Sequence, residues 1–148
     1  MRLLALLLLP SLALAQTGAI VQSPVPSRGV TLPPTGAALV DEATALSLNP
    51  AGLGYVGGSQ LFYLHERNLA RDAVGDGVFL ATRFLGLGVG ASMEWIRGRA
   101  EADYRRTSLG LSLGGRTLQL GGAWHGFSSD SRDIDALSSF DLGLTARP

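Results

Sequence analysis

Residues 85–95 alternate between apolar side chains and small or polar ones. The odd positions from Leu85 to Trp95 are apolar, and the even positions hold glycine, serine or glutamate. Successive side chains of a β-strand point to opposite faces, so the pattern predicts a strand with one apolar and one polar face. This run is longer than a typical globular strand and matches the ~9–11 tilted residues that a strand needs to cross a bilayer.

Three later segments repeat the alternation, and two earlier segments show it less cleanly. The predicted strands are 59–66, 76–84, 85–96, 104–114, 116–127 and 137–147. The predicted fold class is therefore all-β, an antiparallel up-and-down meander of about six strands that forms an incomplete outer-membrane β-barrel. A soluble β-sandwich or meander with one wet face is the alternative, but it does not explain the length of the strands.

The predicted connections alternate between long and short. The long ones are charged and cover 66–76, 97–103 and 128–136, and the short ones cover 84–86 and 114–116. Outer-membrane barrels have short periplasmic turns and longer external loops, so this rhythm orients the sheet with its long loops outward. An aromatic girdle is expected near the long-loop end, formed by Trp95, Tyr104, Trp124 and Phe127.

Two segments at the N-terminus are set apart from the fold. Residues 1–15 combine Arg2, an apolar run and the sequence Ala13-Leu14-Ala15, which is typical of a cleaved secretory signal peptide. Residues 16–36 contain several prolines and form a predicted linker.

Residues 37–58 are expected to form a short helix over 37–48 and then a turn before the predicted barrel region, 59–148. Asp41 and Glu42 fall in the favourable first turn of that helix. Asn49-Pro50 ends the helix, because a residue before proline is pushed out of the helical conformation. A glycine-rich turn follows.

Composition argues against several function classes. The chain has no cysteine, and its formal net charge is +0 at pH 7. Balanced charge argues against a nucleic-acid partner, which would need a basic face. The 2 histidines and the lack of cysteine make a metal site improbable, so neither a metal nor a cofactor is expected.

Two motifs resemble enzyme signatures but stand in the wrong structural context. The segment 52–57 matches G-x-G-x-x-G, yet a dinucleotide site needs a strand before the motif and a helix after it. The segment 110–114 matches G-x-S-x-G, but Ser112 lies inside a predicted strand instead of at a strand-to-helix turn. No catalytic residue is therefore predicted.

The hairpin around 114–116 limits what His125 can reach. A two-residue turn closes it with Gly114-Gly115 or, one step shifted, with Gly115-Arg116. Either register places His125 opposite Tyr104 or Arg106, too far from Ser112 for proton transfer.

Polar residues on the non-apolar strand faces are candidates to line the barrel lumen. They are Glu94, Arg106, Gln119 and His125. Paired charges at Glu94 and Arg106 would be a common structural device inside a barrel and could also tune a pore. The structural role is the favoured reading.

The segment 41–54, with its sequence Asn49-Pro50-Ala51-Gly52-Leu53, resembles a known family. It looks like the N-terminal element of outer-membrane proteins of the long-chain fatty-acid transporter (FadL-like) superfamily. In that superfamily a short helix and an Asn-Pro-Ala-Gly-Leu turn sit inside the barrel as a plug. The resemblance implies plug or gate residues at Asp41, Glu42, Asn49, Pro50, Ala51, Gly52 and Leu53.

A second resemblance covers more of the chain, namely the run from the predicted helix through 63–68 and on to 142–148. These segments are similar to the barrel-like N-terminal region of large envelope proteins of the signal peptide peptidase type, which carry a serine–lysine protease domain downstream. The chain contains no lysine, so that catalytic pair cannot lie within it. Whether the parent protein is an enzyme is left open.

The favoured function is a structural or anchoring module of a larger envelope protein, located in the outer membrane. The alternative is an outer-membrane transporter of hydrophobic small molecules, gated by the plug. The expected partners are outer-membrane lipid, the barrel-assembly machinery and hydrophobic small molecules. About eight strands are the usual minimum for a closed barrel, so the chain is expected to be the leading part of a longer protein, a truncated product, or one of several chains that share a barrel.

Overall fold

The computed structural model describes residues 29, 30, 32, 36, 37, 39–68, 73–98 and 102–147. The predicted signal peptide lies outside the described residues, as does most of the predicted linker.

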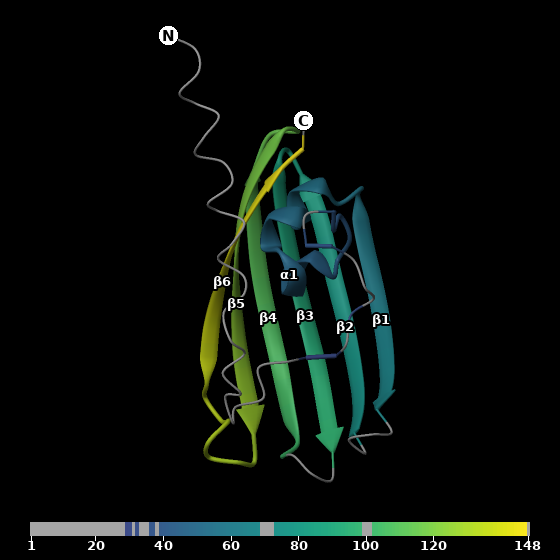
Figure 1. Ribbon diagram of the computed structural model, residues 1–148, viewed down its shortest axis with the longest axis vertical. Helices are drawn as coiled ribbons and strands as arrows, with labels where there is room; N and C mark the ends of the chain where they lie inside the picture. The colour runs from purple at the N-terminus through teal and green to yellow at the C-terminus, as the bar shows by residue number, and fades with distance from the viewer. Residues whose placement is uncertain are drawn as a thin grey trace, which may run out of the picture.

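Within the described residues, six β-strands form one antiparallel sheet in which sequence neighbours pair. The strands are β1 (Ser59–Asn68), β2 (Ala73–Phe84), β3 (Leu87–Gly98), β4 (Tyr104–Gly114), β5 (Leu118–Ser129) and β6 (Ser138–Ala146). The sheet order begins at β1 and ends at β6, so the sheet is open (Figure 1). The predicted all-β, up-and-down meander is confirmed.

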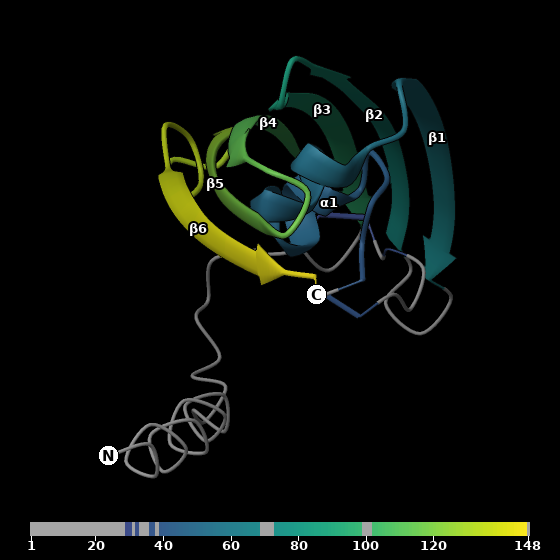
Figure 2. The same ribbon diagram turned by 90° about the horizontal axis from the view of Figure 1, so that it is seen from above.

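A short helical piece precedes the sheet. It consists of the α-helix α1 (Ala45–Leu48) and the 3-10 helix η2 (Pro50–Tyr55). Figure 2 shows that the sheet curves around this piece, which gives it a concave face toward the helices and a convex face away from them. No helix in the described part of the chain is long and apolar enough to cross a membrane.

The two faces of the sheet differ in polarity. Polar side chains buried on the concave face are Ser92, Glu94, Arg106, Ser108, Ser112, Gln119, His125 and Thr145. Large apolar side chains exposed on the convex face include Leu61, Leu80, Leu87, Val89, Leu109, Leu111, Leu113, Leu118, Leu120, Leu142 and Leu144. Because side chains alternate with a period of two, a one-residue slip of any strand would exchange these two sets.

At the end of the sheet with the long connections, the strands pair further than predicted. At the opposite end, with the short turns, they pair less far than predicted. β1 and β2 pair out to Asn68 and Ala73, so the first long connection is shorter than expected. The β2–β3 hairpin turns through Leu85 and Gly86, both with positive φ, so β3 begins at Leu87 and not at Leu85. Positive φ at both central residues is the geometry of a tight two-residue hairpin turn. We call the end with this turn the short-turn end and the opposite end the long-loop end.

The β4–β5 hairpin has neither of the two predicted registers. Leu113 pairs with Leu120 and Gly114 with Gln119, and Gly115 N donates to the carbonyl of Leu118 at 3.0 Å. The turn therefore lies beyond both predicted glycine pairs. The error preserves the faces, because the partner is shifted by an even number of residues.

The predicted helix over 37–48 is wrong in length, since only Ala45–Leu48 is α-helical. Asp41 and Glu42 precede the helix and do not stand in its first turn. Ala43 N donates to the side-chain Oε1 of Gln60 at 3.0 Å, so a strand residue takes a backbone donor of this segment. A single helical turn is not stable alone, and contacts with the sheet decide where it forms.

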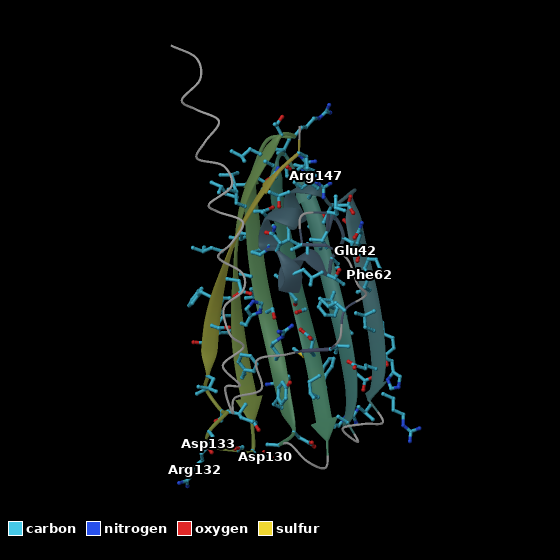
Figure 3. The ribbon with its side chains drawn as sticks, viewed as in Figure 1. Glu42, Phe62, Asp130, Arg132, Asp133 and Arg147 are labelled. Carbon is cyan, nitrogen blue, oxygen red and sulfur yellow. The ribbon has the colours of Figure 1, made fainter. Side chains whose placement is uncertain are left out.

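The predicted aromatic girdle is wrong for two of its members. Tyr104 and Phe127 lie on the concave side, where their ring centroids are 6.2 Å apart, and Tyr104 is 6% exposed. Tyr104 shares the even positions of β4 with Arg106, so the alternation itself excludes it from the convex face. Figure 3 shows Arg147 near the helical piece, and Asp130, Arg132 and Asp133 at the long-loop end.

Candidate functional site on the concave face

Residues 39–56, which we call the docked segment, pack against the concave face. Val40, Leu46 and Leu53 are at most 1% exposed and form one core with sheet residues that include Phe79 and Ala123. Full burial of an aliphatic side chain stabilises by roughly 1.5–3 kcal/mol. The apolar core of the described molecule therefore lies between the docked segment and the sheet.

Asn49 fixes the docked segment at the start of η2. Its Oδ1 accepts from Ala51 N at 3.1 Å, and Pro50 occupies the first turn of η2, where a missing N–H costs nothing. Its Nδ2 donates to the carbonyl of Ala37 at 3.1 Å and to Thr145 Oγ1 on β6 at 3.0 Å. One amide side chain thus caps the 3-10 helix and connects it to the last strand.

Glycines in the strands make room for the backbone of the docked segment. A Cβ at Gly88 would collide with the carbonyl of Leu53, and one at Gly121 would collide with the backbone of Pro50. Such close approach of one backbone to another is possible only where a strand residue lacks a side chain. The frequent glycines of this sheet therefore include positions shaped to the docked segment.

The residues expected to form a plug do not all lie in the same environment. The buried ones are Pro50, Ala51, Gly52 and Leu53. Asp41 is largely exposed, and its Oδ2 lies 3.4 Å from Arg147 Nη1. Glu42 accepts from Thr44 Oγ1 at 2.8 Å. The acidic residues thus stand at the edge of the segment, and the Asn-Pro-Ala-Gly-Leu run stands at its core.

Glu94 and Arg106 face one another across β3 and β4 in the concave face. Glu94 is fully buried and Arg106 is 8% exposed. Arg106 donates to Glu94 Oε1 through Nη2 at 2.7 Å and through Nε at 2.9 Å. Arg106 Nη2 also donates to Ser47 Oγ at 2.9 Å, and Glu94 Oε2 accepts from Val30 N at 2.8 Å. This ion pair connects the sheet to the docked segment and to the chain before it.

Gln119 lies beneath η2 at the short-turn end. It is fully buried, and its Nε2 donates to the carbonyl of Gly115 at 2.7 Å. Its amide would meet a Cβ placed at Gly54, so this glycine of η2 is needed for the contact. Gln119 therefore closes the β4–β5 hairpin beneath the docked segment.

Sequence reasoning missed a hydrogen-bonded chain that links three strands. His125 Nδ1 lies 2.8 Å from Ser108 Oγ, and His125 Nε2 lies 3.1 Å from Asp141 Oδ2. His125 faces Ser108 in the ladder, so its predicted positions opposite Tyr104 or Arg106 are wrong. Only the true register of the β4–β5 hairpin brings these residues together.

This chain contains the residue types of a serine nucleophile, a base and an orienting acid. An Asp141 carboxylate that accepts from Nε2–H leaves Nδ1 to accept the hydroxyl proton of Ser108. However, Ser108 is 0% exposed and His125 is 3% exposed, so a substrate has no access to the hydroxyl. The arrangement therefore serves to hold β4, β5 and β6 together, with the buried Ser108 and His125 side chains hydrogen-bonded and the exposed Asp141 at one end.

Other candidate chemistry is sparse among the residues that the structure describes. Within them, no group of three or more histidine, aspartate or glutamate side chains is placed to hold a metal ion. Ser112, the central residue of the G-x-S-x-G match, is buried in β4 at 2% exposure. Its neighbour across the sheet is Gly88, which supports a packing role.

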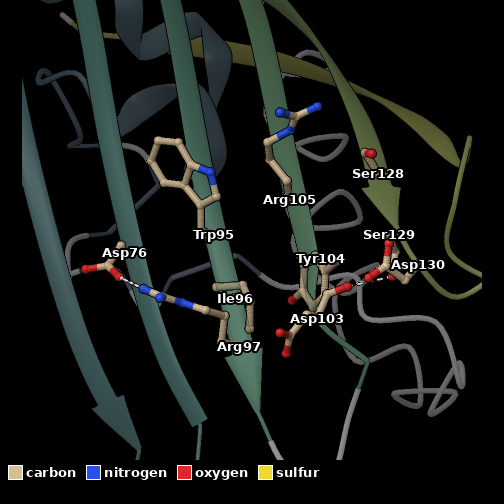
Figure 4. A pocket seen from close by; sticks show the side chains of 10 residues that line it. All are labelled: Asp76, Trp95, Ile96, Arg97, Asp103, Tyr104, Arg105, Ser128, Ser129 and Asp130. Carbon is tan, nitrogen blue, oxygen red and sulfur yellow. Dashed lines mark hydrogen bonds and ion pairs between the residues drawn. The ribbon is translucent and has the colours of Figure 1, made fainter.

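An open depression of about 640 Å³ lies at the long-loop end, mainly over β3 and β4. Its lining comprises Asp76, Trp95, Ile96, Arg97, Asp103, Tyr104, Arg105, Ser128, Ser129 and Asp130. Figure 4 shows Arg97 reaching toward Asp76, and the two side chains form an ion pair of 2.6 Å. This depression is separate from the contacts of the docked segment.

Comparison with protein-family models, with curated proteins and with solved structures gives no match for this chain. The contacts of the chain itself are therefore the basis for a proposal on its function.

Proposed function

We propose that the six strands are part of an outer-membrane β-barrel and that the docked segment is a plug on its inner wall. The module anchors a larger envelope protein. One observation carries this proposal: the sheet buries its polar face and exposes its apolar one. Glu94 and Gln119 are fully buried, whereas Leu111 is 56% and Leu142 is 92% exposed. This polarity suits a surface that meets lipid and an interior that is polar.

The dimensions of the apolar surface support a membrane as the surrounding medium. The convex apolar residues of β3 run from Leu87 to Trp95, which is about 26 Å at ~3.3 Å per residue. The apolar band of a membrane barrel is about 25 Å tall. Because barrel strands are tilted, the apolar length of β3 measured along the barrel axis is somewhat less than this height. Soluble monomers rarely expose a continuous apolar face that crosses several strands.

The free edges of β1 and β6 are part of the proposal. A strand edge within lipid would leave backbone N–H and C=O groups without partners, at several kcal/mol each. We therefore include further strands in the complete barrel, supplied by the same polypeptide or by another one.

An arginine introduced on the convex face, which is proposed to meet lipid, tests the proposal. Leu109 lies at the middle of β4, and Leu109→Arg should lower the free energy of unfolding in phospholipid vesicles by about 2–4 kcal/mol, the cost of arginine at the bilayer midplane. Leu113→Arg, on the same face and paired with Leu87 at the short-turn border of the apolar band, should cost roughly 0–1 kcal/mol. Urea titration of vesicle-bound protein and heat-modifiable gel mobility measure the difference. Recovery of both variants and the parent chain as soluble monomers would overturn the proposal.

Gated transport of hydrophobic small molecules is a second candidate function, because the docked segment occupies the concave face. Non-covalent contacts hold it there, namely the packing of its apolar residues and the hydrogen bonds of Asn49. Removal of residues 39–56 should raise the conductance of the barrel in planar bilayers. The deletion variant must retain heat-modifiable mobility, which shows that the strands still fold. Unchanged conductance in a folded variant would count against gating.

A further inference from the structure

The charged side chains of the convex face gather at the long-loop end. Convex positions of the described strands carry three arginines, Arg67, Arg97 and Arg105, which we call the arginine collar. The one described acidic residue on this face is Asp76. The rest of the convex face, toward the short-turn end, is apolar or neutral. Positive charge is therefore concentrated at one border of the apolar surface.

Asp76, the acidic residue of this border, already has hydrogen-bond and ion-pair partners within the sheet. Asp76 Oδ1 accepts from Tyr63 Oη at 2.7 Å and lies 2.9 Å from His65 Nδ1, and its Oδ2 lies 2.6 Å from Arg97 Nη2. A guanidinium has five N–H donors, so this contact leaves most donors of Arg97 available. Arg105 forms no ion pair with any residue that the structure describes. The collar therefore has donors that no acidic side chain among the described residues uses.

Aromatic residues mark the same level of the sheet. Trp95 faces Arg105 directly across β3 and β4, and it is 37% exposed on the convex face. Tyr63 lies nearby on β1 with its hydroxyl on Asp76. Tryptophan and tyrosine with an apolar ring and a polar tip favour the boundary between lipid tails and headgroups. Figure 4 shows Trp95, Arg97 and Arg105 together along the open depression.

We propose that the arginine collar binds the phosphate groups of anionic lipid headgroups in the leaflet that borders the long-loop end. Guanidinium groups match phosphate oxygens through paired hydrogen bonds. The long arginine stems cover the apolar border, and the charged ends reach the headgroups. Asp103 and Asp130 lie at the loop end of the depression, and their charge disfavours phosphate beyond the collar. This inference rests on the proposed membrane function.

Quenching of Trp95 fluorescence tests the inference in the full chain. Trp124→Phe leaves Trp95 as the sole tryptophan, and the protein is folded into nanodiscs of phosphatidylcholine. Either brominated phosphatidylglycerol or brominated phosphatidylcholine is then added. An arginine near an anionic surface favours anionic lipid by roughly fivefold, so brominated phosphatidylglycerol should occupy the site at a several-fold lower mole fraction.

Matched variants separate the collar from general attraction. Arg97→Gln with Arg105→Gln should remove most of the preference, leaving only the part that Arg67 supplies, and Arg116→Gln in the short-turn hairpin should retain it. Equal quenching by both lipids in the parent chain would overturn the inference. Inorganic phosphate that abolishes the preference would show a site for the free ion and overturn the lipid assignment. Absence of quenching by either lipid would instead overturn the proposed membrane function, and the inference with it.

Discussion

The same strands form the concave and convex faces of the sheet, yet the concave face buries polar side chains and the convex face exposes apolar ones. Ser112 is 2% exposed on the concave face, and its neighbour Leu111 is 56% exposed on the convex face. Burial of the polar residue with exposure of the apolar one is the reverse of the usual trend in folded proteins. The comparison shows that the surroundings of each face, and not the strand itself, determine whether that face carries polar or apolar side chains.

The faces also differ in how their charges are held. The Glu94–Arg106 pair is almost inaccessible, with side-chain exposures of 0% and 9%. The Asp76–Arg97 pair is open to its surroundings, with side-chain exposures of 18% and 61%. A buried charge that loses its partner keeps its desolvation cost, whereas an exposed charge does not. The two pairs therefore provide a direct test of how different the faces are.

The largest expected effect comes from breaking the concave pair. Glu94→Ala leaves the Arg106 guanidinium buried without its carboxylate and should lower the free energy of unfolding by about 3–5 kcal/mol. Asp76→Ala on the convex face should cause a much smaller loss, because Arg97 is open to its surroundings. Urea titration of vesicle-bound protein measures both.

A double variant identifies the cause of that loss. Glu94→Leu combined with Arg106→Met replaces the buried pair with apolar residues and should recover much of the lost stability. Equal losses for Glu94→Ala and Asp76→Ala would contradict the difference between the faces, because the exposure of the two pairs would then have no effect.

The sequence predicts the faces of the sheet far better than it predicts the contacts between strands. Alternation with a period of two decides that Leu111 and Glu94 lie on opposite faces, and no later step can change this without moving a whole strand. The strand number and the up-and-down order follow from the same pattern and from the short hairpins. These features depend on neighbouring residues alone.

The register and the docked segment depend on contacts that the sequence pattern does not contain. Two glycine turns fit the β4–β5 hairpin locally, but Gln119 beneath η2 and the Ser108–His125 contact belong to a different register. The helix before Asn49 is shorter than its propensity suggests, because Gln60 on β1 takes the backbone donor of Ala43. Tyr104 is different, because its even position in β4 places it on the concave face by alternation alone.

A smaller difference in stability is expected between alanine substitutions at two adjacent glycines of β5, which face opposite sides of the sheet. Gly121→Ala places a methyl group against the backbone of Pro50 and Ala51, and overpacking of this kind should cost about 1–3 kcal/mol. Gly122→Ala should be close to neutral, because its Cβ meets only ordinary contacts, the nearest being Leu142 Cδ2 at 3.7 Å. Limited proteolysis should cut the docked segment faster in Gly121→Ala than in Gly122→Ala. Equal cleavage would mean that the glycines of the concave face do not hold the docked segment, and their number would then need an explanation in the strands themselves.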